Sequence, residues 1–134
     1  AYKIIISPQQ LYFGALVPSA PSFSKDLKLG QFYEGLWEED VAEFFLTADD
    51  GDSYQEFNLA PSGAWWTSAF SSYRKRDSSR TFDCGAVKTS ASITANSWEA
   101  FLMIDLDQLM IKTSLNESSK ANVNFILEKN CYLS

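Results

Sequence analysis

The chain has 134 residues, of which 46% are hydrophobic and 21% charged, and its net charge at neutral pH is −6. This length and composition predict one globular domain over residues 1–134. The acidic balance disfavours a nucleic-acid partner, because a phosphate backbone would be repelled. The lack of histidine excludes serine–histidine catalysis and histidine-ligated zinc, haem or copper, so we expect no cofactor.

The apolar segments are too short to cross a membrane. Runs such as Ile4–Ile6 and Phe101–Ile104 fall far short of the ~20 residues that a spanning helix needs. The chain also begins at Ala1 without the charged region, apolar core and cleavage site of an export leader. We therefore expect no membrane partner, and either a cytoplasmic protein or an exported one whose leader has been removed.

Short apolar runs rich in aromatic and β-branched residues follow one another along the chain, separated by Gly, Pro, Asn, Asp and Ser. This pattern is typical of β-strands. The predicted strands cover residues 2–6, 10–17, 41–47, 53–59, 64–68, 87–94, 98–105 and 122–127. This spacing predicts an all-β, antiparallel, jelly-roll-like β-sandwich. At most one short helical turn is expected, near residues 105–110.

The segment from Pro18 to Glu38 is long and contains prolines and glycines. Long ordered loops in compact domains are often functional. Trp37 lies at the end of this segment, just ahead of a predicted strand. We expect its ring to project from the loop; the alternative is a plug at the edge of the core.

Two turn signals link the central predicted strands. Asp49–Asp52 has the Asp and Gly residues that a tight hairpin requires, and Ala60–Gly63 combines Pro with Gly in the same way. The three strands around these turns should form a meander. A structural calcium ion at Asp49–Asp52 is an alternative that we do not predict, since the spacing differs from that of an EF-hand loop.

Strand alternation places Glu43 on the same face as its apolar neighbours Val41 and Phe45. After the turn, Tyr54, Glu56 and Asn58 share one face, and the hairpin would bring them beside Glu43. Carboxylates, an amide and aromatic rings are the groups that bind sugars, because sugars present both hydroxyls and apolar C–H faces. The alternative is a solvated face on which Glu43 and Glu56 pair with lysine or arginine.

The remaining tryptophans divide between core and site. Trp65 and Trp66 are adjacent, so they point to opposite faces and at most one, for which we take Trp66, can line the site. Trp98 opens an apolar strand and is expected in the core.

Arg74 belongs to a basic cluster with Lys75, Arg76 and Arg80. Such a cluster is typical of a solvated face. Contact with an anionic ligand, or a salt bridge to the acidic strands, is the alternative, and Arg74 is included among the candidate site residues.

Cys84 and Cys131 are the only cysteines and lie far apart in the sequence. Their spacing matches neither a metal site nor a redox motif. Buried free thiols are the first interpretation, and a single disulfide is the alternative.

Leu36–Leu46 and Tyr54–Trp66 resemble the family 9 carbohydrate-binding modules and their DOMON-like relatives. Trp98–Leu109 and Asn122–Leu127 resemble the closing strands of that group. The resemblance implies a non-catalytic sugar-binding β-sandwich, of a kind often attached to xylanases and other extracellular glycan-degrading enzymes, and hence an exported protein. Trp37 would match the tryptophan on which a sugar ring stacks, and Glu43 the acid that accepts hydrogen bonds from hydroxyls.

The sequence therefore predicts a non-enzymatic domain that binds a mono- or oligosaccharide. An interaction or self-association domain on the same fold is the alternative, and a glycoside hydrolase that uses Glu43 and Glu56 comes third. The predicted site residues are Trp37, Glu43, Tyr54, Glu56, Asn58, Trp66 and Arg74.

Overall fold

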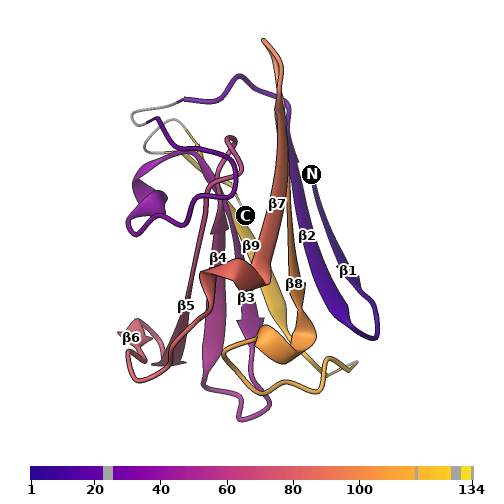
Figure 1. Ribbon diagram of the computed structural model, residues 1–134, viewed down its shortest axis with the longest axis vertical. Coiled ribbons are helices and arrows are strands. Elements are labelled where there is room, and N and C mark those ends of the chain that lie inside the picture. The colour runs from indigo at the N-terminus through magenta and orange to yellow at the C-terminus, as the bar shows by residue number, and fades with distance from the viewer. Residues whose placement is uncertain (23–25, 117, 128–130, 134) are drawn as a thin grey trace.

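A computed structural model describes residues 1–22, 26–116 and 118–127, together with the backbone of 131–133 (Figure 1). These residues form two β-sheets, packed as a β-sandwich. This confirms the predicted all-β antiparallel class. The helical pieces in the described part of the chain are short 3-10 turns, and none has the length and apolarity of a membrane-spanning helix.

The strands divide into a four-stranded sheet of order β1-β2-β8-β7 and a six-stranded sheet of order β10-β9-β3-β4-β5-β6, all paired antiparallel. The strands are β1 (Tyr2–Ile6), β2 (Gln10–Val17), β3 (Val41–Thr47), β4 (Tyr54–Leu59), β5 (Trp65–Ser72), β6 (Lys75–Arg76), β7 (Val87–Ile93), β8 (Trp98–Asp105), β9 (Ala121–Leu127) and β10 (Cys131–Leu133). The 3-10 turns are η1 (Leu36–Glu38), η2 (Cys84–Ala86) and η3 (Leu106–Gln108).

All eight predicted strands are present, and most of their ends agree with the prediction to within a residue. The exception is β5, which continues to Ser72 rather than ending at Ser68. The sequence did not predict β6 and β10, because strands of two or three residues are too short to show a period. The helical turn expected near residues 105–110 is η3, whereas η1 and η2 were not predicted.

The core lies between the two sheets and is built around stacked phenylalanines. Phe44 on β3 stacks on Phe13 of the four-stranded sheet, with ring centroids 5.2 Å apart, and on Phe57 of the neighbouring strand β4 at 5.9 Å. Trp65 and Trp98 are fully buried in the same cluster. The predicted core position of Trp98 is therefore confirmed.

The two predicted turns are formed, and each depends on a glycine with positive φ. Gly51 has φ 82° in the turn between β3 and β4, and Gly63 has φ 84° in the turn between β4 and β5. L-residues with a side chain rarely adopt this conformation. The glycines thus allow the tight reversals that bring β3, β4 and β5 together as a meander.

Cys84 corrects one prediction. It lies in η2 as a free, exposed thiol rather than a buried one, and it forms no disulfide with Cys131. The connection between β6 and β7, which contains η2, leaves its side chain exposed. The side chain of Cys131 lies outside the described part of the structure.

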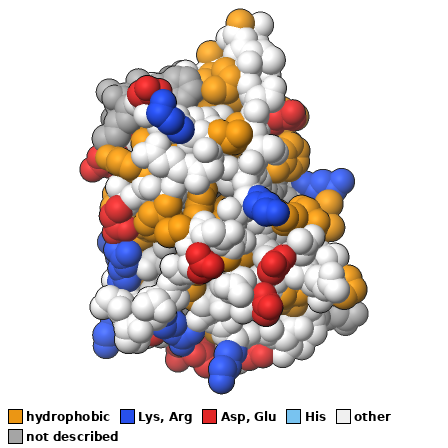
Figure 2. All heavy atoms as spheres, viewed as in Figure 1, with side chains coloured by type: hydrophobic (Ala, Val, Ile, Leu, Met, Phe, Trp, Pro, Cys, Tyr) orange, Lys and Arg blue, Asp and Glu red, His pale blue; other side chains and the backbone are white. Residues whose placement is uncertain are grey.

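The surface carries exposed hydrophobic side chains as well as charges. On the face drawn in Figure 2, acidic and basic side chains are interspersed, with hydrophobic side chains between them. The outer face of the four-stranded sheet exposes Ile5, Leu16 and Phe101, each 45% or 46% exposed. Exposed apolar groups on one face are a feature of interaction surfaces.

Replacing Phe44 by alanine tests the core. Phe44→Ala should lower the free energy of unfolding by ~3–5 kcal/mol, because it leaves a cavity between Phe13 and Phe57. Chemical denaturation followed by circular dichroism measures the loss. Phe101→Ala, at a position that is 46% exposed, should cost clearly less; equal losses would contradict the packing described.

Candidate functional site

The outer face of the six-stranded sheet holds the predicted polar residues. Glu43 on β3 lies opposite Asn58 on β4 and Asn124 on β9, and Phe45 lies opposite Glu56. This register confirms that Tyr54, Glu56 and Asn58 share one face with Glu43. The residues with the opposite alternation face the core.

A cleft with a volume of about 730 Å³ opens over this face. We call it the acidic cleft. Its lining residues are Trp37, Glu43, Phe45, Tyr54, Glu56, Trp66, Phe70, Tyr73, Arg74, Arg76 and Asn124. Six of the seven predicted site residues, all but Asn58, are thus brought together around one cavity.

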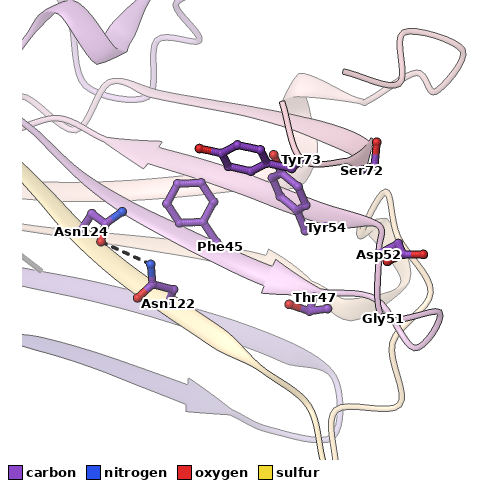
Figure 3. Close-up of a pocket in the computed structure, with 9 residues that line it drawn as sticks. All are labelled: Phe45, Thr47, Gly51, Asp52, Tyr54, Ser72, Tyr73, Asn122 and Asn124. Atoms are coloured by element: carbon purple, nitrogen blue, oxygen red, sulfur yellow. Dashed lines mark hydrogen bonds between the residues drawn. The ribbon is translucent and has the colours of Figure 1, made fainter. Parts of the chain in front are cut away.

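A second hollow of about 500 Å³ adjoins the acidic cleft and extends toward the β3–β4 hairpin. The two share Phe45, Tyr54, Tyr73 and Asn124. Figure 3 shows the rings of Phe45, Tyr54 and Tyr73 gathered together, with the asparagines on β9 beside them. The two cavities therefore form one extended, aromatic-lined depression.

The long loop between β2 and β3 positions Trp37 in the lining of the cleft. Its backbone docks on the edge of β5: the Tyr33 amide donates to the Trp65 carbonyl at 3.0 Å, and the Trp65 amide donates to the Gln31 carbonyl at 2.9 Å. The chain then turns into η1, which carries Trp37. The Trp37 ring is 42% exposed and packs edge-on against Trp66, with centroids 5.1 Å apart. The predicted projection of Trp37 from the loop is therefore observed.

One wall of the cleft is a charged network around Trp66. The Trp66 indole nitrogen donates to Glu34 Oε2 at 2.5 Å, and the Arg76 guanidinium forms an ion pair with the same carboxylate. Arg76 Nε also donates to Ser68 Oγ at 2.8 Å, and its guanidinium lies 5.4 Å from the centroid of the Trp66 ring. The hydrogen bond from Arg76 lowers the pKa of Glu34. The charge of Arg76 is thus neutralised at the rim.

The floor of the cleft holds two largely buried carboxyl groups. Burial raises the pKa of Glu43, which also accepts a hydrogen bond from the Asn124 side chain. Burial, with the nearby charge of Glu43 as the second cause, raises the pKa of Glu56 to about 7. Neither carboxyl group has an ion pair with lysine or arginine among the described residues. The alternative of a solvated, ion-paired face is therefore not what the structure shows.

Asn58 lies behind the cleft rather than in its lining. Its side chain is fully buried. In the amide orientation that gives both the oxygen and the nitrogen suitable hydrogen-bond partners, the nitrogen donates to Glu56 Oε1 at 3.1 Å and to the Phe57 carbonyl at 3.2 Å. Asn58 therefore positions Glu56 and has no direct access to a ligand in the cleft.

Arg74 stands at the rim, in the turn between β5 and β6. Its φ of 58° is unusual for a residue with a side chain. Its amide donates to the Tyr54 hydroxyl at 3.1 Å, which ties the turn to β4. The guanidinium lies over the Tyr73 ring, 5.2 Å from its centroid. Arg74 thus holds the Tyr73 side of the cleft in place.

Aromatic side chains form the rest of the wall. Tyr54 and Phe70 stack face to face with centroids 4.8 Å apart, and Phe45 lies 6.2 Å from Tyr54. The Tyr73 side chain is 79% exposed. The cleft thus presents two exposed rings, Trp37 and Tyr73, above a polar floor.

Several lining residues were not predicted, and the largest omission is Asn124. Asn122 and Asn124 are spaced by two in a predicted strand, and this spacing indicates a polar face, but only the pairing of β9 with β3 shows where that face lies. Phe45 was assigned to the Glu43 face but was not included in the site. The other omissions, on β5, β6 and their turn, are Phe70, Tyr73 and Arg76.

The described residues contain no group of three or more Cys, Asp or Glu side chains arranged to hold a metal ion. In the turn that suggested the calcium alternative, Asp49 accepts hydrogen bonds from Ser114, and Asp50 from Ser53 and the Asp52 amide. These bonds brace the hairpin.

Comparison with known proteins supports the fold. No family model and no curated protein matches the chain. A solved structure that does match is "a putative carbohydrate-binding protein" from Bacteroides uniformis, with a TM-score of 0.68 and 17% sequence identity. The match covers 98% of this chain and 66% of that one, so the chain spans just under two thirds of the length of its structural neighbour. At this identity the likeness establishes the β-sandwich fold.

The pKa of Glu56 predicts a pH-dependent stability. Because folding raises this pKa from 4.5 to about 7, the folded protein holds a proton that the unfolded chain releases between these values. The free energy of unfolding should therefore fall by ~1–3 kcal/mol as pH rises from about 4.5 to 7. Denaturation across this range should show a flatter profile for Glu56→Gln. Glu99→Gln, at an exposed position on β8, is the control; equal slopes in wild type and Glu56→Gln would contradict the burial of this carboxyl group.

Proposed function

We propose that the protein binds carbohydrate in the acidic cleft and does not catalyse a reaction there. The observation that carries the proposal is the pairing of an exposed tryptophan ring in the lining of the cleft with buried and half-buried hydrogen-bonding groups on its floor. Trp37 offers a flat apolar face to the C–H surface of a pyranose. Glu43, Glu56 and Asn124 offer acceptors and donors to its hydroxyls.

The size of the cleft suits this ligand class. Its volume of about 730 Å³ lies within the ~300–1,000 Å³ typical of small-molecule sites. The adjoining hollow extends the lining toward the β3–β4 hairpin, so that a second sugar unit has a place beside the first. Stacking and a few hydrogen bonds exchanged against water favour a micromolar to millimolar affinity, on the order of −4 to −8 kcal/mol.

Two likenesses to other proteins also support the proposal. The structural neighbour from Bacteroides uniformis carries a description of carbohydrate binding. The resemblance of Leu36–Leu46 to the family 9 modules assigns the stacking ring to Trp37 and the hydrogen-bonding acid to Glu43, and both line the cleft. No tryptophan follows Trp98 in the sequence to act as a second stacking ring. We propose that Tyr73 takes that place.

Catalysis is a less favoured use of the same carboxyl groups. A raised pKa on Glu56 beside Glu43 is the feature that a general acid needs. Glycoside hydrolysis, however, requires two carboxyl groups that flank the scissile bond. Glu43 and Glu56 rise from neighbouring strands on one floor of the cleft, so both reach a ligand from the same side. This placement favours hydrogen bonding over hydrolysis.

Protein interaction is the second candidate function. The observation that favours it is the apolar outer face of the four-stranded sheet, with Ile5, Leu16 and Phe101 exposed. A partner protein or a second copy of the chain would then bind on that outer face, which is the opposite side of the sandwich from the cleft. The two functions therefore predict different binding surfaces.

Replacing Trp37 tests the proposed function. Trp37→Ala should weaken binding of a sugar at least tenfold, because the stacking surface is lost, and should leave the far-ultraviolet circular dichroism unchanged, because the ring is 42% exposed. Calorimetric titration with glucose- and xylose-based mono- and oligosaccharides gives the affinities.

Tyr2→Ala is a matched control, since Tyr2 is 58% exposed on β1, an edge strand of the four-stranded sheet, whereas the cleft lies on the six-stranded sheet. It should bind like the wild type. If Trp37→Ala binds sugar as tightly as the wild type, Trp37 is not part of the site. If the wild type binds none of the sugars, the proposal of carbohydrate binding is overturned.

A further inference from the structure

The acidic cleft has an unbalanced charge. Glu43 is only 9% exposed and Glu56 is half-buried, and both stand on the floor without a lysine or arginine ion-pair partner among the described residues. Burying a carboxylate without a counter-charge is costly, because water no longer stabilises it. The groups that do contact the pair are the neutral side chains of Asn58 and Asn124.

The arginines at the rim do not supply the missing charge. Arg76 is held by Glu34 and Ser68, and its guanidinium lies over Trp66. Arg74 lies over the exposed ring of Tyr73, in the β5–β6 turn. The positive charges of the cleft are thus positioned on its walls by other contacts, while the floor remains acidic.

The walls around this floor are aromatic. Trp37, Phe45, Tyr54 and Tyr73 line the same cavity, and aromatic faces attract cations as well as the C–H groups of sugars. An acidic floor between aromatic walls is therefore complementary to a ligand that carries both a pyranose ring and a positive charge.

We infer that the ligand of the acidic cleft is a sugar bearing a protonated amine, which Glu43 and Glu56 bind while the sugar ring stacks on Trp37. This inference rests on the proposed function and specifies its ligand class. The ammonium group would replace the proton that the carboxyl pair otherwise retains near neutral pH, and it would donate charge-assisted hydrogen bonds to both carboxylates. A neutral hydroxyl at the same place would bring no positive charge, so the pair would keep its proton and could form only ordinary hydrogen bonds with the ligand.

Three sugars that share one pyranose ring test the inference. Glucosamine, glucose and N-acetylglucosamine differ in the group at C2, and only glucosamine carries a positive charge there below the pKa of its amine. Calorimetric titration under that condition compares the charged sugar with two neutral ones. Glucosamine should bind about tenfold more tightly than either neutral sugar, the usual difference between charge-assisted and neutral hydrogen bonds. Added salt should reduce the preference, because it screens the charges.

Two variants test whether Glu56 on the floor of the cleft causes the preference for glucosamine. Glu56→Gln should reduce the ratio of the glucosamine and N-acetylglucosamine affinities toward one, whereas Glu99→Gln on the outer face of the other sheet should leave the ratio as in wild type. A full preference in Glu56→Gln would overturn the assignment.

The possible outcomes separate the inference from the proposed function. Equal affinities for the three sugars would overturn the amino-sugar preference while carbohydrate binding stands. Methylamine is the additional probe: if it binds as tightly as glucosamine, the sugar ring contributes nothing, and both the inference and the proposed function are overturned. Absence of saturable binding to every sugar would overturn both as well.

Discussion

The register between β3 and β4 is the constraint on which the rest of the structure depends. It places Phe44 opposite Phe57 and Glu43 opposite Asn58. Because successive side chains in a strand alternate between faces, the same pairing that stacks the phenylalanines in the core assembles the carboxyl groups on the outer face. A slip of one residue would exchange the two sets. Core packing therefore fixes the geometry of the cleft.

The loop ahead of β3 completes what the sheet alone cannot provide. A flat sheet face offers a floor without walls, and a floor alone would leave a ligand exposed to water. The loop docks by backbone hydrogen bonds on the edge of β5 and continues into η1, which sets Trp37 against Trp66. On the other side the β5–β6 turn raises Tyr73, held by the bond between Arg74 and the Tyr54 hydroxyl. Two local connections thus turn a sheet face into a cleft.

The acidic floor of the cleft lowers the free energy of unfolding at neutral pH. The carboxyl groups of Glu43, which is buried, and Glu56, which is half-buried, lie close enough for the charge of Glu43 to raise the pKa of Glu56, and together they oppose folding at neutral pH. Polar groups that reduce stability are characteristic of functional sites, because a sheet chosen for stability alone would place apolar or ion-paired residues there. Asn58 and Asn124 offset part of the cost by hydrogen bonding to the pair. The arrangement is accordingly consistent with the ligand site that we propose.

Local sequence signals predicted the strands and much of the cleft. The period-two alternation within each strand and the Asp-Gly turn between the strands predicted a shared face for Glu43 and Glu56, provided that the hairpin register allowed it, and the pairing of β3 with β4 supplies that register. Asn58 shares that alternation, yet it is fully buried, because alternation gives the face of a residue and not its depth. Asn124 and Arg76 reach the cleft through the pairing of β9 with β3 and through the very short strand β6. Long-range pairing and two-residue strands leave no local period, so the sequence could not place them.

The tryptophan indole signals give the most direct test of the account. The chain has four tryptophans: Trp37 and Trp66 line the cleft, while Trp65 and Trp98 lie in the core. A proton–nitrogen NMR spectrum recorded during titration with glucosamine and neutral sugars reports each indole N–H separately. The account predicts that the Trp37 and Trp66 signals shift in a saturable manner while those of Trp65 and Trp98 stay in place. Shifts confined to amides on the outer face of the four-stranded sheet, or no shift at all, would contradict it.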